Sequence, residues 1–138
     1  LISLYKNNLN IIAVYTQSPK RKERGMEIKK TPVHSFCEKN NILVHSPKNF
    51  NLSDNIEEFK ALKPDICIVM GYGILFPKEV LNIPKFGFIN IHVSLLPRWR
   101  GPSPIEYAIL NGDTKTGVTI FQIEEKLDTG PILSFREI

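Results

Sequence analysis

The sequence has little that would place the chain in a membrane or in an oxidising compartment. Its apolar runs fall well short of the roughly 20 residues that a transmembrane helix needs, and its first residues do not resemble a signal peptide. Only two cysteines occur, Cys37 and Cys67, and they lack the close spacing of a metal site. Cys67 lies within an apolar run. We therefore expect inert thiols, no bound metal and a cytoplasmic protein.

Phosphate-binding loops and internal repeats are also missing. Neither G-x-G-x-x-G nor the P-loop motif occurs, so the two commonest nucleotide-binding loops are excluded. The 138 residues, 42% of them hydrophobic, suit one ordinary globular domain. The sequence begins at Leu1 rather than at a methionine, and its last residues have the pattern of a strand. We therefore expect part of a longer protein.

Strand-like and helix-like segments alternate along the chain. The strand-like segments are residues 10–15, 42–44, 65–70, 86–93, 116–122 and 131–138. The helix-like segments are residues 1–8, 32–40, a stretch that Ser53 or Asp54 caps and Pro64 ends, 77–81 and 104–110. For the segment at 32–40, Thr31 supplies an N-cap and Pro32 the first helical residue. The alternation predicts an α/β protein with a doubly wound, mostly parallel, Rossmann-like sheet. The nearly continuous apolar run at 65–70 predicts a strand covered on both faces.

Two polar residues interrupt the apolar strand at 86–93. Asn90 and His92 are two residues apart, so in a strand their side chains project to the same side. They could form a satisfied polar pair in the core, but an irregular turn containing Pro97 and Gly101 follows them, which favours an active site. A histidine can move a proton, and an asparagine amide can donate to a developing oxyanion. The pair suits attack of an amine on a carbonyl without a nucleophilic serine or a metal.

Other candidate site residues have two interpretations each. Asp128, before Thr129 and Gly130, either forms an ordinary Asx-turn or orients His92 and favours its protonated form. The segment Gly71-Tyr72-Gly73 is too short for a phosphate loop, and its glycines favour close backbone approach to a flat ligand. We expect the two other histidines to be surface residues: His34 and His45.

The positive charge of the chain is concentrated between residues 18 and 30. This segment holds six cations against two glutamates, a net of +4 that equals the formal charge of the whole chain. The cations are Lys20, Arg21, Lys22, Arg24, Lys29 and Lys30. Such a segment is either solvated surface or a flexible arm for a polyanion, and composition leaves both open.

Several segments together resemble a known family. The sequence N-I-H-V-S-L-L-P-R-W-R-G at 90–101 resembles the signature of the folate-dependent formyltransferases, most closely the members that act on methionyl-tRNA. Supporting matches are G-Y-G-I-L-F-P at 71–77, N-G-D at 111–113, G-V-T-I at 117–120 and L-D-T-G at 127–130. The order and spacing of these segments match the family from about residue 11 onward.

The resemblance implies a catalytic trio and two binding regions. The trio is Asn90, His92 and Asp128. The folate-binding residues are Ser94, Leu95, Leu96 and Pro97, with Gly71, Tyr72 and Gly73. The tRNA-binding residues are the six cations of the basic segment, with Arg98 and Arg100 added to that surface.

The implied reaction transfers a formyl group from 10-formyltetrahydrofolate, as co-substrate and without a metal, to the amino group of methionine on initiator tRNA. The enzyme would be a cytoplasmic monomer that serves translation initiation. Residues 1–138 would form a partial N-terminal catalytic domain, lacking the first strand and the C-terminal oligonucleotide-binding barrel of the family.

The alternatives are a glycinamide ribonucleotide or sugar-nucleotide acceptor, or a catalytically incomplete RNA- or folate-binding fragment. Two residues depart from the family pattern. Val93 stands where a small residue is usual, and Lys126 stands where glycine is usual, which puts the backbone before Asp128 in doubt.

Overall fold

The computed structural model describes residues 1–18, 20–22, 27–50 and 52–138. Contacts divide the chain into two compact units, Leu1–Leu62 and Lys63–Ile138. The first unit carries most of the basic segment, and the second carries the residues of the expected catalytic trio. No helix in the described ranges is long and apolar enough to cross a membrane.

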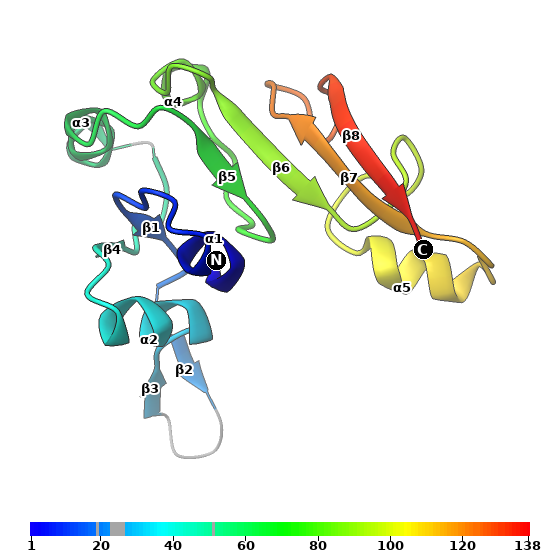
Figure 1. The fold of residues 1–138 in the computed structure, drawn as a ribbon, viewed down its shortest axis with the longest axis horizontal. Coiled ribbons are helices and arrows are strands. Elements are labelled where there is room, and N and C mark those ends of the chain that lie inside the picture. The colour runs from blue at the N-terminus through cyan, green and yellow to red at the C-terminus, as the bar shows by residue number, and fades with distance from the viewer. Residues whose placement is uncertain (19, 23–26, 51) are drawn as a thin grey trace. The chain divides into compact units, whose positions relative to one another are not determined.

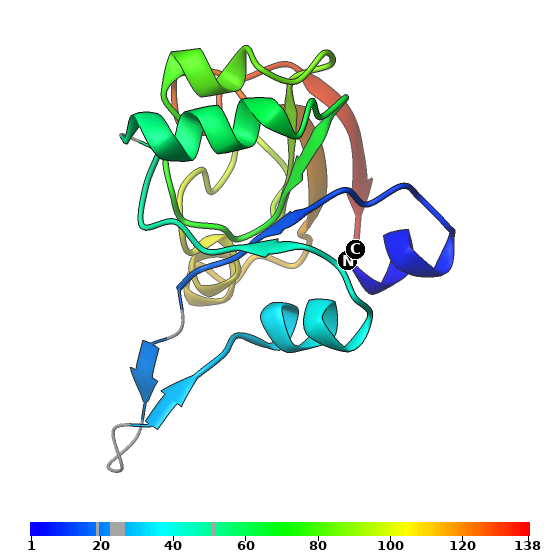
Figure 2. The ribbon, with the colours of Figure 1, turned by 90° about the vertical axis from the view of Figure 1, so that its left-hand side faces the viewer.

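The first unit contains short strands and three helices. Its elements are α1 (Ile2–Lys6), β1 (Val14–Tyr15), β2 (Lys20–Lys22), β3 (Glu27–Lys29), α2 (Pro32–Lys39), β4 (Val44–His45) and α3 (Ser53–Ala61). β1 pairs with β4 in parallel, whereas β2 and β3 are antiparallel. Figure 2 shows β1 beside β4 and the β2–β3 pair as a separate ribbon. The basic segment, for which composition left solvated surface or a flexible arm open, therefore has most of its described residues in two paired strands.

The second unit is built on one four-stranded sheet in the order β5-β6-β7-β8 (Figure 1). Its elements are β5 (Cys67–Val69), α4 (Lys78–Leu81), β6 (Phe88–His92), α5 (Pro104–Leu110), β7 (Gly117–Gln122) and β8 (Ile132–Glu137). β5 and β6 are parallel, and β7 is antiparallel to both of its neighbours. The expected α/β class is confirmed, and the sheet that carries the site is mixed, with one parallel pair.

Local sequence signals placed some helix ends well. The side chain of Thr31 accepts a hydrogen bond from the His34 backbone and caps α2, whose first residue is the proline that the sequence predicts. The expected bounds of α5 are also confirmed. The helix expected before Pro64 is confirmed as α3, but neither Ser53 nor Asp54 caps it, because Leu52 occupies the cap position and makes no side-chain capping bond.

Three predictions about burial were wrong. β5 was expected to be covered on both faces, yet Ile68 is 42% exposed, since β5 is an edge strand of its sheet in the described structure. His45 was expected on the surface. Its side chain is instead only 12% exposed, because β4 pairs with β1 and stacks the imidazole on the Tyr15 ring. His34 is likewise largely covered and lies 3.5 Å from a carboxylate oxygen of Glu38.

The core of the second unit lies where α4, β6 and β7 supply large apolar side chains. Val80, Phe88 and Phe121 are buried, and the Phe76 ring packs 4.7 Å from that of Phe88. Burial of such side chains stabilises a fold by about 1.5–3 kcal/mol each. This packing holds β6 and β7 together, and these strands position the site.

The start of β7 depends on the absence of a side chain at Gly117. A Cβ atom there would lie 2.2 Å from the Arg136 carbonyl oxygen and 2.6 Å from a methyl carbon of Leu95. We predict that Gly117→Ala lowers the free energy of unfolding by roughly 1–3 kcal/mol or more, because the β7–β8 pairing must open.

Gly112→Ala is the matched control, because a Cβ there meets open space and only the left-handed φ of +66° opposes it. That strain costs about 1 kcal/mol. Chemical denaturation of both variants measures the difference. Equal losses would contradict the close approach of the strands at Gly117.

Candidate functional site

β6 carries the two polar residues that the sequence singles out. Asn90 lies opposite Phe121 on β7, and His92 lies opposite Thr119. The Asn90 side-chain oxygen is buried and, in the described part of the chain, has no hydrogen-bond partner. An unpaired buried polar atom costs about 1–3 kcal/mol. The chain therefore holds a hydrogen-bond acceptor on β6 without using it for its own stability.

The imidazole of His92 is fixed by a backbone carbonyl. Its Nε2 lies 2.8 Å from the Trp99 oxygen, and its side chain is only 7% exposed. Because a carbonyl oxygen only accepts hydrogen bonds, Nε2 carries the proton. The other ring nitrogen, Nδ1, lies 3.8 Å from Asp128 Oδ2. A proton placed on Nδ1 would be stabilised by that carboxylate.

Asp128 is brought to His92 by the turn between β7 and β8. Its side chain is 8% exposed, and its Oδ2 accepts a hydrogen bond of 2.7 Å from the Gly101 backbone N–H. The distance to His92 is that of an ion pair rather than of a hydrogen bond. The Trp99 carbonyl therefore provides the direct orienting contact to the imidazole, while Asp128 supplies charge and holds the loop.

The turn after β6 is tied to β7 by a buried threonine. Thr119 donates from Oγ1 to the Ser94 carbonyl at 2.7 Å and accepts from the Leu96 N–H at 3.1 Å. Ser94 is fully buried and donates its hydroxyl to the Arg98 carbonyl at 2.6 Å. Ser94 therefore shapes the turn, whereas Leu96 and Pro97 present their side chains to a pocket.

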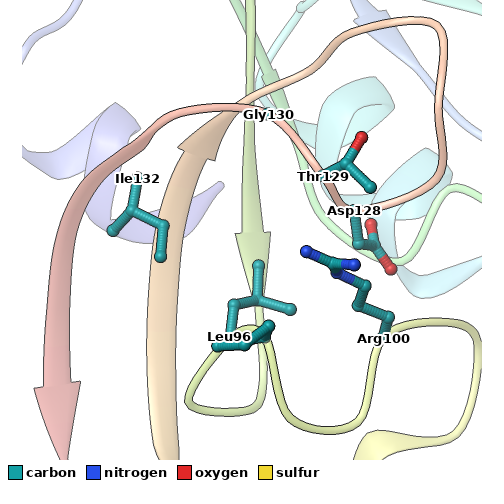
Figure 3. A pocket seen from close by; sticks show the side chains of 7 residues that line it. Leu96, Arg100, Asp128, Thr129, Gly130 and Ile132 are labelled. Atoms are coloured by element: carbon teal, nitrogen blue, oxygen red, sulfur yellow. The ribbon is translucent and has the colours of Figure 1, made fainter.

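A pocket of about 230 Å³ opens beside Asp128. It is lined by Leu96, Pro97, Arg100, Asp128, Thr129, Gly130 and Ile132. Figure 3 shows the Arg100 guanidinium and the Asp128 carboxylate turned toward each other, with the side chains of Leu96 and Ile132 nearby. An apolar wall next to two opposite charges suits a ligand that has a flat apolar part and a polar reacting end.

Two residues at the site adopt a left-handed backbone conformation, which is unfavourable for residues that have a side chain. Trp99 has a φ of +57° and Asp128 a φ of +51°. Such conformations cost about 1–3 kcal/mol each and occur at functional sites where the surroundings enforce them. Lys126, where the sequence put the backbone in doubt, is not among the described residues with positive φ. The left-handed residue of this turn is Asp128 itself.

Other predicted site residues lie apart from the pocket lining. Gly71 and Gly73 have φ values of +58° and +73°, and between them Tyr72 stacks on Phe76, with ring centroids 5.9 Å apart. Burial raises the pKa of the Tyr72 hydroxyl to about 12. The structure gives this segment a turn and an anchor in the core.

Four of the six predicted tRNA-binding cations lie in strands: Lys20, Arg21 and Lys22 in β2, and Lys29 in β3. Arg24 lies outside the described residues. Lys30 forms an ion pair of 2.6 Å with Glu38. Arg98 binds Asp113 through two nitrogens, and its place on a tRNA-binding surface stays a prediction.

The protonation of the two cysteine thiols follows from their burial, and the capacity to bind a metal follows from the spacing of ligand-type side chains. Burial raises the pKa of the Cys67 thiol to about 12 and also raises that of Cys37, so both thiols stay protonated near neutrality. Within the described ranges, no group of three or more histidine, cysteine, aspartate or glutamate side chains is placed to hold a metal ion.

Sequence reasoning missed three groups of this site. The Trp99 carbonyl is a backbone atom and has no sequence signature. Thr119 and Asp113 act across more than ten residues of chain. Two arginines beside a tryptophan gave a signal that could have found Asp113, because a partly buried arginine fork needs a carboxylate partner.

Comparison with known proteins identifies the family. A model of the formyl transferase family matches residues 1–138. The chain belongs to this family. Methionyl-tRNA formyltransferases from Wolbachia of Drosophila simulans and from Ehrlichia canis are 51% and 54% identical over 94% and 93% of this chain. The one from Legionella pneumophila strain Corby is 47% identical over 96%. The chain covers 42–44% of the length of these three relatives.

Solved structures show the same fold. A phosphoribosylglycinamide formyltransferase from Bacillus halodurans has a TM-score of 0.80 and 26% identity, covering 99% of this chain and 71% of its own. A glycinamide ribonucleotide transformylase from Geobacillus kaustophilus has a TM-score of 0.79 and 24% identity, covering 99% and 73%. The Rossmann-like formyltransferase fold is therefore confirmed for this chain.

The unpaired amide of Asn90 leads to a prediction about stability. Asn90→Val replaces it with a β-branched residue that suits a strand, so we expect the free energy of unfolding to stay unchanged or to rise. Thr119→Val is the matched control, because it removes a buried hydroxyl whose two hydrogen bonds are both used. That change should destabilise by about 1–3 kcal/mol. Equal destabilisation in denaturation experiments would mean that Asn90 has a structural partner.

Proposed function

We propose that the protein carrying this chain transfers a formyl group from 10-formyltetrahydrofolate to the amino group of methionine on initiator methionyl-tRNA. The observation that carries the proposal is the placement of the Asp128 carboxylate beside His92, on whose strand Asn90 holds a side-chain oxygen without a partner in the described residues. Relatives about half identical to this chain bear the name methionyl-tRNA formyltransferase, which favours that acceptor.

The pocket supports a folate donor. Its volume of about 230 Å³ is below the roughly 300–1,000 Å³ of sites that enclose a drug-sized ligand, so it fits part of a folate rather than all of it. Leu96, Pro97 and Ile132 provide the apolar surface that a flat ring requires. When bound, the donor supplies an activated formyl carbon. Asn90 and His92 are then the polar side chains that interact with the oxygen of the formyl group.

Each member of the trio has a distinct task in the proposed reaction. The methionine nitrogen forms a bond to the formyl carbon, the bond from that carbon to the folate nitrogen breaks, and a proton passes from the amine to that nitrogen. Asn90 donates from its side-chain N–H to the formyl oxygen and so stabilises negative charge there. His92 carries a proton on Nδ1, and the nearby Asp128 carboxylate stabilises that positive charge.

The basic segment supports a nucleic-acid acceptor. Four of its cations lie in the β2–β3 ribbon: Lys20, Arg21, Lys22 and Lys29. A small phosphorylated acceptor carries too few phosphates to need six cations. We propose that this ribbon contacts the tRNA backbone.

We also propose that residues 1–138 belong to the N-terminal catalytic domain of a longer enzyme. That enzyme is monomeric and cytoplasmic, and it has a further oligonucleotide-binding barrel.

A direct test compares three acceptors with the longer protein. Formylation of initiator methionyl-tRNA, of glycinamide ribonucleotide and of an amino sugar nucleotide is followed with 10-formyltetrahydrofolate as donor. We expect kcat/KM to be highest for the tRNA. His92→Ala and Asn90→Ala should each lower kcat, by roughly 10²–10³-fold if each removes one group that stabilises the oxyanion.

The result separates the alternatives. A preference for glycinamide ribonucleotide or the sugar nucleotide would make one of those the acceptor and would overturn the tRNA proposal. Near-normal turnover by His92→Ala would remove the trio from the chemistry. A rise in KM with unchanged kcat would recast Asn90 and His92 as binding groups.

The basic ribbon leads to a prediction about salt dependence. Each lost phosphate contact should flatten the slope of log K against log salt by about 0.7–0.9. Replacing Arg21, Lys22 and Arg24 with alanine should therefore weaken tRNA binding and flatten this slope, while folate affinity stays unchanged. Fluorescence titrations of tRNA at several salt concentrations measure both quantities.

The matched control removes three exposed cations elsewhere in the first unit: Lys6, Lys39 and Lys48. This control keeps the change in net charge and leaves the ribbon intact, so its salt slope should match that of the unaltered protein. Superimposed curves for the ribbon variant and the unaltered protein would show that the ribbon is ordinary solvated surface.

A further inference from the structure

Asp113 does not line the pocket, yet it binds both residues that begin the loop around His92. Its two carboxylate oxygens accept hydrogen bonds from Arg98 Nη2 at 2.6 Å and Arg98 Nε at 2.8 Å. Oδ2 also accepts from the Trp99 indole N–H at 2.7 Å. The donors Arg98 and Trp99 hold the pKa of Asp113 down at about 2, so the carboxylate is charged near neutrality.

This interaction differs from an ordinary surface ion pair. The Asp113 side chain is only 11% exposed, whereas that of Arg98 is 57% exposed. A bidentate arginine–carboxylate pair fixes direction as well as distance, and the indole N–H adds a third donor from a second residue. Exposed single-contact pairs contribute about 0–1 kcal/mol and have little geometric effect. The geometry at Asp113 instead fixes the position of the indole.

The Trp99 ring is also held by stacking. It lies nearly parallel to the Tyr107 ring of α5, with centroids 5.5 Å apart and planes 11° apart. The Arg98 guanidinium carbon lies 4.3 Å from the centroid of the Trp99 ring. The hydrogen bond to Asp113 thus fixes the edge of a ring whose plane stacking already sets.

The same residue, Trp99, orients His92 through its backbone. Its carbonyl oxygen lies 2.8 Å from His92 Nε2, and two residues later the Gly101 N–H donates to Asp128. The backbone at Trp99 is left-handed, a conformation that costs about 1–2 kcal/mol for a residue with a side chain. A loop in that conformation needs contacts outside itself to stay there, and Asp113 provides three of them.

We propose that Asp113 is a positioning residue: by binding Arg98 and Trp99 it fixes the Trp99 carbonyl against His92 Nε2 and so sets the tautomer and orientation of the imidazole. This inference rests on the proposed function for its kinetic consequence. Asp113 touches neither the pocket nor the reacting atoms. Its effect passes through one side chain and one backbone carbonyl to the histidine.

The test compares the longer protein with its Asp113→Asn variant, which keeps the size of the side chain and removes its charge. We expect kcat for formylation to fall by about 10–10²-fold, the usual effect of losing a group that orients a functional histidine, with unchanged KM values. Nitrogen NMR in alkaline buffer should show the proton leaving Nε2 of His92 for part of the population. The indole N–H signal of Trp99 should shift.

Glu137→Gln is the matched control, because it removes an exposed ion pair of 2.8 Å with Lys115, which like Asp113 lies just before β7. It should change none of these readouts. Trp99→Phe keeps an aromatic ring and the carbonyl and removes the indole N–H together with the five-membered ring that carries it, so it should lower kcat in the same direction and decides the matter if Asp113→Asn fails to fold.

An unchanged kcat and an unchanged His92 spectrum in Asp113→Asn would overturn the inference. The NMR readout needs no substrate, so it separates this inference from the proposed function. If the unaltered protein formylates no acceptor while the His92 tautomer still depends on Asp113, the proposed function fails and the positioning role stands. If the unaltered protein is active and the variant equally so, only the positioning role fails.

Discussion

The hydrogen bond between His92 Nε2 and the Trp99 carbonyl determines what the candidate site can do. Because the carbonyl only accepts, the proton is kept on Nε2, and Nδ1 is left on the side of Asp128. The bond also joins the end of β6 to the loop before α5. That loop reaches Asp128 through the Gly101 N–H. One contact therefore couples a strand, a loop and a turn from distant parts of the chain.

The site concentrates features that a stable fold normally avoids. The Asn90 oxygen is buried without a partner in the described structure, and Trp99 and Asp128 both adopt left-handed backbone. Stability comes from elsewhere, from the buried aromatic residues Phe88 and Phe121 and from Thr119, whose hydroxyl is fully used. Breaks with local rules at one place, amid ordinary packing around it, are typical of a site kept for function.

Local signals in the sequence predicted local structure well. A threonine cap followed by a proline predicted the start of α2, and Pro104 with the turn after Leu110 predicted the bounds of α5. The i, i+2 spacing placed Asn90 and His92 on one strand. In these cases the cause lies within a few residues of its effect, which is why the sequence could reveal it.

Features that depend on long-range contacts could not be predicted in the same way. The direction of the strands in the sheet is one such feature. β7 and β8 are antiparallel to their neighbours, although the alternation of helices and strands along the chain predicted a mostly parallel sheet. The burial of His45 depends on β4 pairing with β1. The orienting group of His92 is a backbone carbonyl, and the carboxylate that holds Trp99 lies 14 residues further on. Motif resemblance located the trio, but it was silent on the contacts that arrange it.

The most direct measurement is a crystal structure of the longer protein with an inert analogue of 10-formyltetrahydrofolate. A site of the proposed kind predicts the formyl oxygen within about 3 Å of the Asn90 amide, with the folate ring against Leu96 and Ile132. His92 Nε2 should still lie on the Trp99 carbonyl. Binding of the analogue at another surface, with Asn90 still unpaired and the pocket beside Asp128 empty, would contradict the assignment of this site to formyl transfer.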